Sequence, residues 1–294
     1  MILSEEVSID AKNPTVSPSV EIFEVDVFNY QTSTIALLHQ LGKKVICYFS
    51  VGTAENTRPD YGNFTAVDIG EALVDWPGEN YVNISSPAVW DIMKARIKLA
   101  SDKNCDGIEP DNTDIYSNDG GGLNITPGDV IIYFQKLAQE IHSYNMSIGL
   151  KNSQEILPNV SSLAQFAINE ECSYQDSTCS AYADFTNPSQ VVLSSGIVPK
   201  PVFHVEYVNY TDTSAGSDPA ATEMTITNDF WPNVTEAVLL SNLCLTEPQS
   251  TGNPLETTLK LSTIIKTLEL DGWMMDCNGL ISVTATTDFI KAAS

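Results

Sequence analysis

Basic residues and histidines are scarce in this sequence of 294 residues. Lys and Arg number 14 against 38 Asp and Glu, which gives a net charge of −24, and there are three histidines. So negative a surface repels phosphate backbones, which excludes nucleic acid as a partner. His39, His142 and His204 are scattered and show no zinc-ligand spacing, so we expect neither a metal site nor a Ser-His-Asp triad.

Long apolar runs and several enzyme motifs are also missing. No stretch approaches the roughly 20 apolar residues of a membrane span. The motifs G-x-S-x-G, G-x-x-x-x-G-K-[ST], G-x-G-x-x-G and H-E-x-x-H do not occur, and we expect no cofactor. The first residues do not resemble a signal peptide, which leaves open a mature chain or a sequence that starts after its leader. We expect a monomer without membrane contact.

The sequence does contain six cysteines and seven N-glycosylation sequons. An even cysteine count without a C-x-x-C pair suggests three disulfides, with buried reduced thiols as the alternative. We expect the pairs Cys47–Cys105, Cys172–Cys179 and Cys244–Cys277. The sequons favour an oxidising compartment, and we predict a secreted glycoprotein. They begin at Asn63, Asn83, Asn124, Asn145, Asn159, Asn209 and Asn233.

Apolar strand-like runs alternate with helical patterns along the chain, which predicts βα units and a parallel sheet. We therefore predict a single (β/α)8 TIM-like barrel domain over 1–294, with its first strand missing or replaced. Residues 1–20 are expected to be irregular, and 208–257 to form a long loop region. The expected helices are Ser33–Leu41, Ser86–Ser101, Thr126–Tyr144 and Thr257–Leu268. The expected strands are Ile22–Phe28, Lys44–Ser50, Asp106–Asp111, Ser147–Lys151, Gln165–Glu170, Val202–Tyr207, Ala237–Ser241 and Gly272–Asp276.

Nearly every expected strand ends in an ionisable or hydrogen-bonding residue. In a barrel these strand ends form the active-site face. Gathering carboxylates there costs free energy, but glycoside cleavage needs one protonated and one ionised carboxyl group. The alternative for Glu109 is a structural role in a salt bridge or cap at the strand end. The alternative for Asp26 and Asp276 is that they orient backbone amides. The strand-end residues are Asp26, Tyr48, Glu109, Asp111, Lys151, Glu170, Glu171, Glu206 and Asp276.

Several motifs, in order along the chain, resemble glycoside hydrolase family 114, the endo-α-1,4-polygalactosaminidase type. They cover roughly residues 20–210, and a weaker match at 268–277 extends the resemblance to the last strand. Family members usually begin with a tryptophan-containing first strand, which has no counterpart here before residue 20. The matching motifs are Val45–Gly52, Arg58-Pro59-Asp60, Trp76-Pro77-Gly78-Glu79, Cys105–Asn112, Ile148–Asn152, Phe166–Cys172 and Val205–Tyr207.

This resemblance implies a barrel that cleaves an α-1,4-linked galactosamine polymer with retention of configuration. Asp111 matches the family's nucleophile and Glu170 its general acid/base, although the sequence does not separate Glu170 from Glu171. The substrate-binding candidates are Asp26, Tyr48, Glu109, Lys151, Glu206 and Asp276. The negative charge would attract a cationic, partly deacetylated polymer. The alternatives are a barrel glycosidase for another sugar polymer and a catalytically silent polysaccharide-binding barrel.

Overall fold

The computed structural model describes residues 1–173, 178–187, 198–212, 224–244 and 259–289. These residues form two compact units. The first comprises Met1–Ile168 with Ala285–Ser294, and the second comprises Asn169–Thr284. The single domain predicted over 1–294 stays a prediction, and each unit is described separately below.

A parallel sheet forms the centre of the first unit. Its strands are hydrogen-bonded in the order β2-β3-β7-β8-β9. The strands of such a sheet are covered on both faces, which explains their continuous apolar runs. Val45, Ile46, Cys47 and Phe49 of β3, for example, are all buried. The strands are β2 (Ile22–Asp26), β3 (Lys44–Ser50), β7 (Gly107–Asp111), β8 (Ser147–Lys151) and β9 (Phe166–Glu170).

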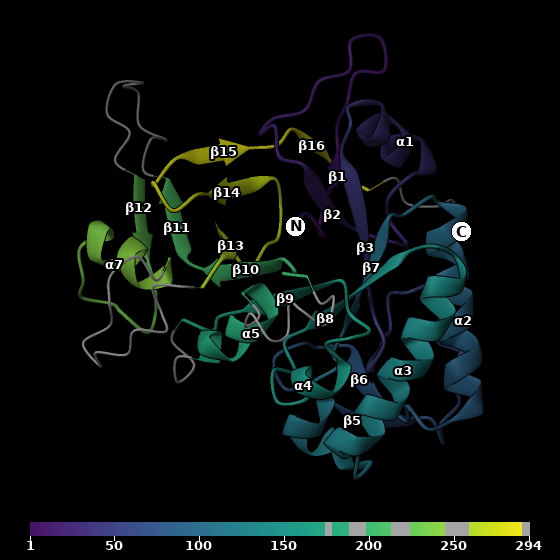
Figure 1. Cartoon of the computed structure of the whole chain (residues 1–294). Helices are drawn as coiled ribbons and strands as arrows, with labels where there is room; N and C mark the ends of the chain where they lie inside the picture. Colours follow the sequence, from purple (N-terminus) through teal and green to yellow (C-terminus); the bar gives the residue numbers. More distant parts are fainter. Residues whose placement is uncertain (174–177, 188–197, 213–223, 245–258, 290–294) are drawn as a thin grey trace. The chain divides into compact units, whose positions relative to one another are not determined.

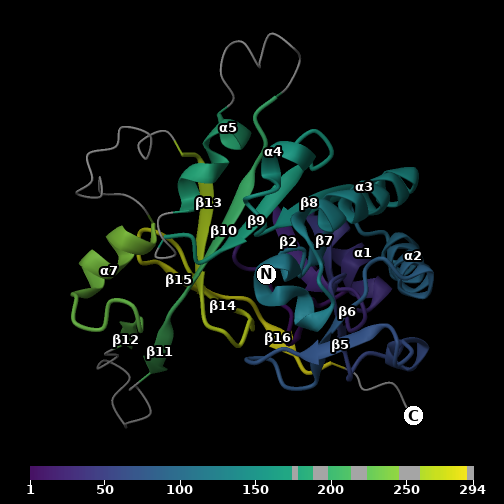
Figure 2. The ribbon, with the colours of Figure 1, turned by 90° about the horizontal axis from the view of Figure 1, so that it is seen from below.

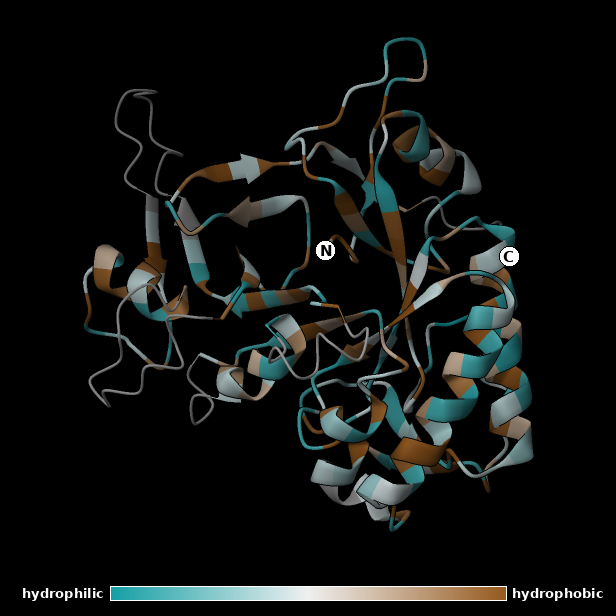
Figure 3. Ribbon diagram, viewed as in Figure 1, coloured by the Kyte–Doolittle hydropathy of each residue, from teal (hydrophilic) through white to brown (hydrophobic). Residues whose placement is uncertain are grey.

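Three amphipathic helices accompany these strands: α1 (Thr32–Gln40), α2 (Pro87–Asp102) and α3 (Pro127–Ser143). Thr126 and Asp129 form a capping box at the start of α3, where the helix predicted from Thr126 begins. Helices α2 and α3 lie side by side (Figures 1 and 2), and hydrophilic and hydrophobic residues alternate along both (Figure 3). Their apolar stripes contribute the buried residues Val89, Ile92, Met93, Ile97, Val130, Phe134, Leu137 and Ile141.

Smaller elements complete the first unit. The segment 53–83 contains an antiparallel sheet of β4 (Thr53–Glu55), β6 (Glu79–Val82) and β5 (Ile69–Ala72). Ile2 forms a parallel bridge with Val25 on β2, and β1 (Glu6–Val7) pairs with β16 (Thr286–Thr287). The short helices are η1 (Tyr61–Asn63), η2 (Ile115–Gly122) and α4 (Leu157–Val160).

In the second unit β10 (Val202–Tyr207) pairs in parallel with β13 (Leu261–Lys266). From β13 the sheet continues through antiparallel β14 (Trp273–Met275) and β15 (Ile281–Val283). Strands β11 (Asn209–Asp212) and β12 (Met224–Thr227) form an antiparallel pair. The helices are η3 (Thr178–Tyr182), α5 (Ala183–Thr186) and α7 (Glu236–Leu243). Buried core residues include Val208, Leu239, Leu243, Ile265, Trp273 and Met275.

Three predictions for this unit were wrong. The strand predicted at 237–241 lies inside helix α7, whose N-terminus is capped by the side chain of Thr235. The helix predicted at 257–268 contains strand β13, where Thr263, Ile264 and Ile265 are β-branched and favour strand. The described part of the predicted loop region 208–257 contains β11, β12 and α7.

All three predicted disulfides are confirmed, at Cys47–Cys105, Cys172–Cys179 and Cys244–Cys277. In the first unit, Cys47–Cys105 links β3 to the residue that precedes β7 by two positions. In the second, Cys172–Cys179 closes a loop directly after β9. Within the described part of the chain, no helix has the length and apolar character needed to cross a bilayer.

Candidate active site

Asp111 ends strand β7 in the first unit, and three side chains donate hydrogen bonds to it. The Tyr48 hydroxyl and the Asn112 amide nitrogen each lie 3.1 Å from Oδ2 of Asp111. The Lys151 ammonium group lies 3.0 Å from Oδ1. The Asp111 side chain keeps 17% of its surface exposed. The carboxylate is therefore firmly oriented and still reachable from solvent.

Backbone geometry at the strand ends explains how these donors reach Asp111. Asn112 has a φ of 59°, and Asn152, directly after β8, has a φ of 49°. Asparagine is among the few residues that tolerate this left-handed region. The chain thus makes a sharp turn directly after Asp111 and again directly after Lys151. Tyr48 reaches Asp111 from β3, which is the neighbour of β7 in the sheet.

Glu109 and Lys151 lie beneath Asp111. Glu109 is fully buried, and the Lys151 Nζ lies 3.6 Å from its Oε1. Neither carboxylate oxygen of Glu109 has a hydrogen-bond partner among the described residues. Lys151, itself 5% exposed, thus contacts two carboxylates. Lys151 therefore connects Glu109 to Asp111, and the substrate-binding roles predicted for Glu109 and Lys151 stay predictions.

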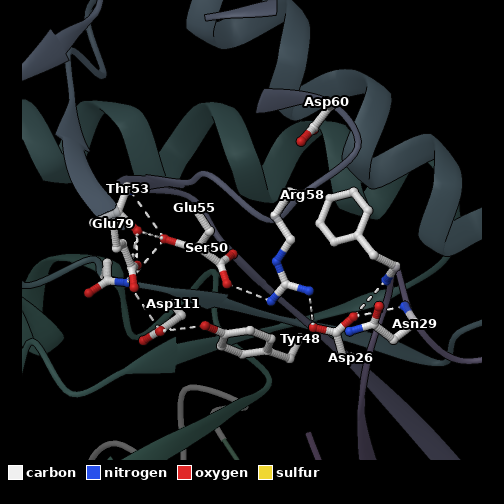
Figure 4. A network of polar contacts seen from close by, with 12 residues as sticks. Asp26, Asn29, Tyr48, Ser50, Thr53, Glu55, Arg58, Asp60, Glu79 and Asp111 are labelled. Carbon is white, nitrogen blue, oxygen red and sulfur yellow. Dashed lines mark hydrogen bonds and ion pairs between the residues drawn. The ribbon is translucent and has the colours of Figure 1, made fainter. Parts of the chain in front are cut away.

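A second polar cluster comes from the small antiparallel sheet (Figure 4). Glu79 of β6 accepts a short hydrogen bond from the Thr53 hydroxyl and lies 3.3 Å from the Asn112 amide nitrogen. Burial, together with the neighbouring charges of Glu55 and Asp111, raises the pKa of Glu79 to about 7 against the opposing Thr53 hydrogen bond. Burial also raises the pKa of Tyr48 well above its usual range.

Asp26 lies in an ion-pair chain rather than at an open position. It is 1% exposed, accepts hydrogen bonds from the amides of Phe28 and Asn29 at 2.9 Å, and pairs with Arg58 at 2.6 Å. Arg58 in turn pairs with Glu55 at 2.6 Å (Figure 4). Burial disfavours the Arg58 charge, but these carboxylates outweigh it and raise its pKa. Asp26 thus orients two backbone amides and pairs with Arg58, and its predicted role in substrate binding stays a prediction.

The chain passes from the first unit to the second after Ile168, within β9, so Glu170 at the end of this strand belongs to the second unit. Glu170 accepts a hydrogen bond from the Tyr207 hydroxyl at 2.5 Å. Glu171 follows the strand with a φ of 64°, and its amide donates to the carbonyl oxygen of Val205 at 2.9 Å. A left-handed φ at a residue other than glycine or asparagine is uncommon and often marks a functional turn. The two glutamates therefore have different backbone environments.

The other two predicted residues of this unit are Glu206 and Asp276, and each has hydrogen-bond partners of its own. Glu206 is fully buried, accepts from the amide of Ser173 at 2.9 Å and lies 2.6 Å from Nε2 of His204. Asp276 caps the turn after β14, where it accepts from the amides of Asn278 and Leu280. These backbone hydrogen bonds lower the pKa of Asp276. Asp276 therefore stabilises a turn, and its predicted role in substrate binding stays a prediction.

Comparison with known proteins identifies the family. A family model described as glycoside-hydrolase family GH114 matches residues 4–282. The chain belongs to glycoside hydrolase family GH114. The crystal structure of Ega3 from Aspergillus fumigatus in complex with galactosamine is similar, with 38% sequence identity and a TM-score of 0.70. The match covers 93% of this chain and 92% of that one.

The glycoside hydrolase domain of PelA from Pseudomonas aeruginosa is a more distant structural neighbour. It has a TM-score of 0.56 at 10% identity, over 91% of this chain and 96% of that one. At this identity the likeness concerns the fold alone. No curated protein matches the chain. Membership in GH114 confirms the predicted TIM-like barrel class and shows that the protein is a glycoside hydrolase.

The sequence did not predict the polar side chains that surround the amide of Asn112. Ser50, Thr53 and Asn112 were not singled out as site residues, and Glu79 was quoted only within a motif. The W-P-G-E motif itself was the available signal. In the second unit Cys172, Cys179 and His204 lie within 4.8 Å of one another, but the two cysteines form a disulfide and so offer no thiolate to a metal.

Proposed function

We propose that this protein is a secreted, retaining endo-glycosidase that hydrolyses α-1,4-linked galactosamine and N-acetylgalactosamine polysaccharide. Asp111 is its nucleophile and Glu170 its general acid/base. The observation that carries the proposal is the Asp111 carboxylate, held by three donors at a strand end and still exposed. The galactosamine bound by Ega3, a 38% identical relative, supports the choice of sugar.

In the first step an oxygen of Asp111 attacks the anomeric carbon. The bond from that carbon to the leaving oxygen breaks, and Glu170 gives its proton to this oxygen. Tyr48, Asn112 and Lys151 fix the attacking carboxylate, so little reorientation is needed at the moment of reaction. The product is a glycosyl ester on Asp111.

In the second step Glu170 removes a proton from water as the water oxygen attacks the same carbon. The ester bond breaks, Asp111 leaves as the carboxylate, and the sugar keeps its original configuration. Tyr207 donates to Glu170 and fixes its position. We assign the acid/base role to Glu170 over Glu171 because Glu170 is the residue that belongs to the strand.

The remaining assignments rest on charge and covalent chemistry. A net charge of −24 attracts a cationic, partly deacetylated polymer, and this attraction weakens as salt is added. Three disulfides fit an oxidising compartment, and all sequon asparagines except Asn83 are exposed. We propose a secreted, glycosylated monomer that needs no metal or cofactor for this chemistry.

The test is cleavage of an α-1,4-linked galactosamine polymer, with products followed by mass spectrometry. Asp111→Asn and Glu170→Gln should each lower the rate by about a hundredfold or more, whereas Glu171→Gln should cleave the polymer. Proton NMR of the first product should show the α-anomer if configuration is retained. Folded wild type that releases no product would refute the substrate. Products from other polymers would point to another sugar, and binding without any cleavage would point to a silent binder.

A further inference from the structure

The side-chain amide of Asn112 has more acceptors within reach than it has hydrogens. Its nitrogen lies 3.0 Å from the Ser50 hydroxyl, 3.2 Å from that of Thr53, 3.3 Å from Glu79 Oε1 and 3.1 Å from Asp111 Oδ2. An amide NH₂ group has two hydrogens to donate. The four oxygens therefore compete, and two of them belong to carboxyl groups.

Among these four acceptors we single out Glu79, because the hydrogen bonds that it accepts depend on whether its carboxyl group is protonated. It faces Asp111 from β7, Glu55 from β4 and the Arg58 guanidinium beyond β4, with the phenols of Tyr48 and Tyr81 as further titratable neighbours. Its contact with the Thr53 hydroxyl continues to the Ser50 hydroxyl, which lies next to Thr53. The Glu79 carboxyl group is thus linked through the hydroxyls of Thr53 and Ser50 to the side-chain amide of Asn112.

We propose that Glu79 is a positioning residue: its carboxyl group and the nucleophile Asp111 share the amide of Asn112, and its protonation state sets how that amide holds Asp111. This inference rests on the proposed function of Asp111. It adds a residue that does not touch the reacting atoms. Its effect passes through Asn112.

Two states follow from hydrogen-bond counting. When Glu79 is neutral, its O–H donates to Thr53, Thr53 donates to Ser50, and the hydrogens of Asn112 are left for Ser50 and Asp111. When Glu79 is ionised it only accepts, so Thr53 turns toward it and the Asn112 amide is drawn away from Asp111. Asp111 then loses one of its three donors and gains a negative neighbour.

The sign of the pH effect follows from this exchange. The neutral form supports Asp111, so activity is higher where Glu79 is protonated. Burial raises the pKa of Glu79 to about 7, which puts the change inside the range in which an enzyme is assayed. We expect an alkaline decline in kcat/KM centred near that value.

The first test compares pH profiles of kcat/KM on the galactosamine polymer for wild type, Glu79→Gln and Glu71→Gln. Glu71 is exposed on β5 of the same small sheet and is the matched control for loss of a charge. Between about pH 6 and about pH 8 a single titration lowers the wild-type and Glu71→Gln values by about tenfold. Over the same pH range, kcat/KM of Glu79→Gln should fall less than about twofold. An equal decline in Glu79→Gln would overturn the proposal, because a purely structural role changes the level and leaves the profile's shape.

The second test needs no substrate, and the spectra of the wild-type protein alone can overturn the proposal. In ¹H–¹⁵N spectra of the wild-type protein, the side-chain NH₂ signals of Asn112 should shift with a midpoint near the Glu79 titration. In Glu79→Gln that shift should vanish. Static Asn112 signals in the wild type would overturn the proposal. If the polymer is not cleaved at any pH, the proposed function fails alone, since these spectra still decide the Glu79–Asn112 exchange.

Discussion

The ring of Phe166 lies directly over Gly149, so that a Cβ atom at position 149 would stand 2.2 Å from Cε2 of the ring. Phe166 begins β9 and Gly149 is its register partner in β8. Gly149→Ala should therefore force the ring or the strand to move, at a cost of about 1–3 kcal/mol in the free energy of unfolding. Urea denaturation of the protein measures this change in the free energy of unfolding.

Gly128→Ala is the matched control for that substitution. A Cβ at Gly128 would meet only the Thr126 hydroxyl at 3.6 Å, which is ordinary contact, and the residue lies in the first turn of α3. Alanine favours helix over glycine by up to about 1 kcal/mol, so this variant should be as stable as wild type or more so. Equal stability of the two variants would contradict the overlap at Phe166.

Tyr48→Phe should weaken catalysis without weakening the fold. It removes the hydroxyl that donates to Asp111 at 3.1 Å. A hydrogen bond to a charged group is worth about 1.5–3 kcal/mol, so kcat/KM should fall by about 10- to 100-fold. Tyr116→Phe removes a tyrosine-to-carboxylate hydrogen bond of 2.8 Å at an exposed site, to Glu155, and is the control. An equal loss in both variants would argue against a role of Tyr48 at Asp111.

The stability of the protein should fall as pH rises through the titration of Glu79. Its pKa is about 7 in the folded protein against an ordinary value of 4.5, so the folded state binds more protons between these values. Stability linked to Glu79 is then fully present below about pH 4.5 and lost above about pH 7, a change of up to about 3 kcal/mol. Glu79→Gln should gain stability over wild type at pH 8 relative to pH 5, as seen by urea denaturation. A constant difference at both pH values would contradict this.

Six of the sequons should carry glycans when the protein passes through a eukaryotic secretory pathway. Asn63, Asn124, Asn145, Asn159, Asn209 and Asn233 are exposed. Asn83 is half-buried, and its side-chain oxygen accepts a hydrogen bond from the amide of Ser85. Mass spectrometry after enzymatic release, which converts each occupied asparagine to aspartate, should mark all but Asn83. Unmodified exposed sequons would contradict secretion by that route.

Much of the first unit was predictable from the sequence because its strands are buried on both faces. The bounds predicted for the strands at 44–50 and 147–151 agree with β3 and β8, and the helix starts at Pro87 and Pro127 follow from local capping residues. These patterns are local in the chain. They need no knowledge of what packs against them.

The second unit was harder to predict because its short apolar runs fit both the helical period of 3.6 residues and the strand period of two. Residues 237–241 are apolar enough for a strand, and only the cap at Thr235 favours the helix. Residues 261–266 face a parallel partner, β10, that is distant in sequence. Such pairing depends on tertiary contacts, which a propensity does not contain.

The polar side chains around the amide of Asn112 were missed for a similar reason. Glu79 reaches Asn112 because β6 pairs with β4, and β4 follows β3 by two residues. No spacing in the sequence relates position 79 to position 112. The strand-end rule selected Asp111, Lys151 and Glu170, since that rule depends on strands, but not the side chains that the small antiparallel sheet brings to Asn112, next to Asp111.

The pairing of β1 with β16 has a consequence for synthesis. Residues 6–7 hydrogen-bond with residues 286–287, and Tyr30 packs edge-on against Phe289, so residues far apart in the sequence complete the unit that contains Asp111. Translation delivers residues 285–289 after the whole of the second unit. Until they emerge, β1 lacks its partner strand. The unit that contains Asp111 therefore cannot finish folding before the second unit has been synthesised.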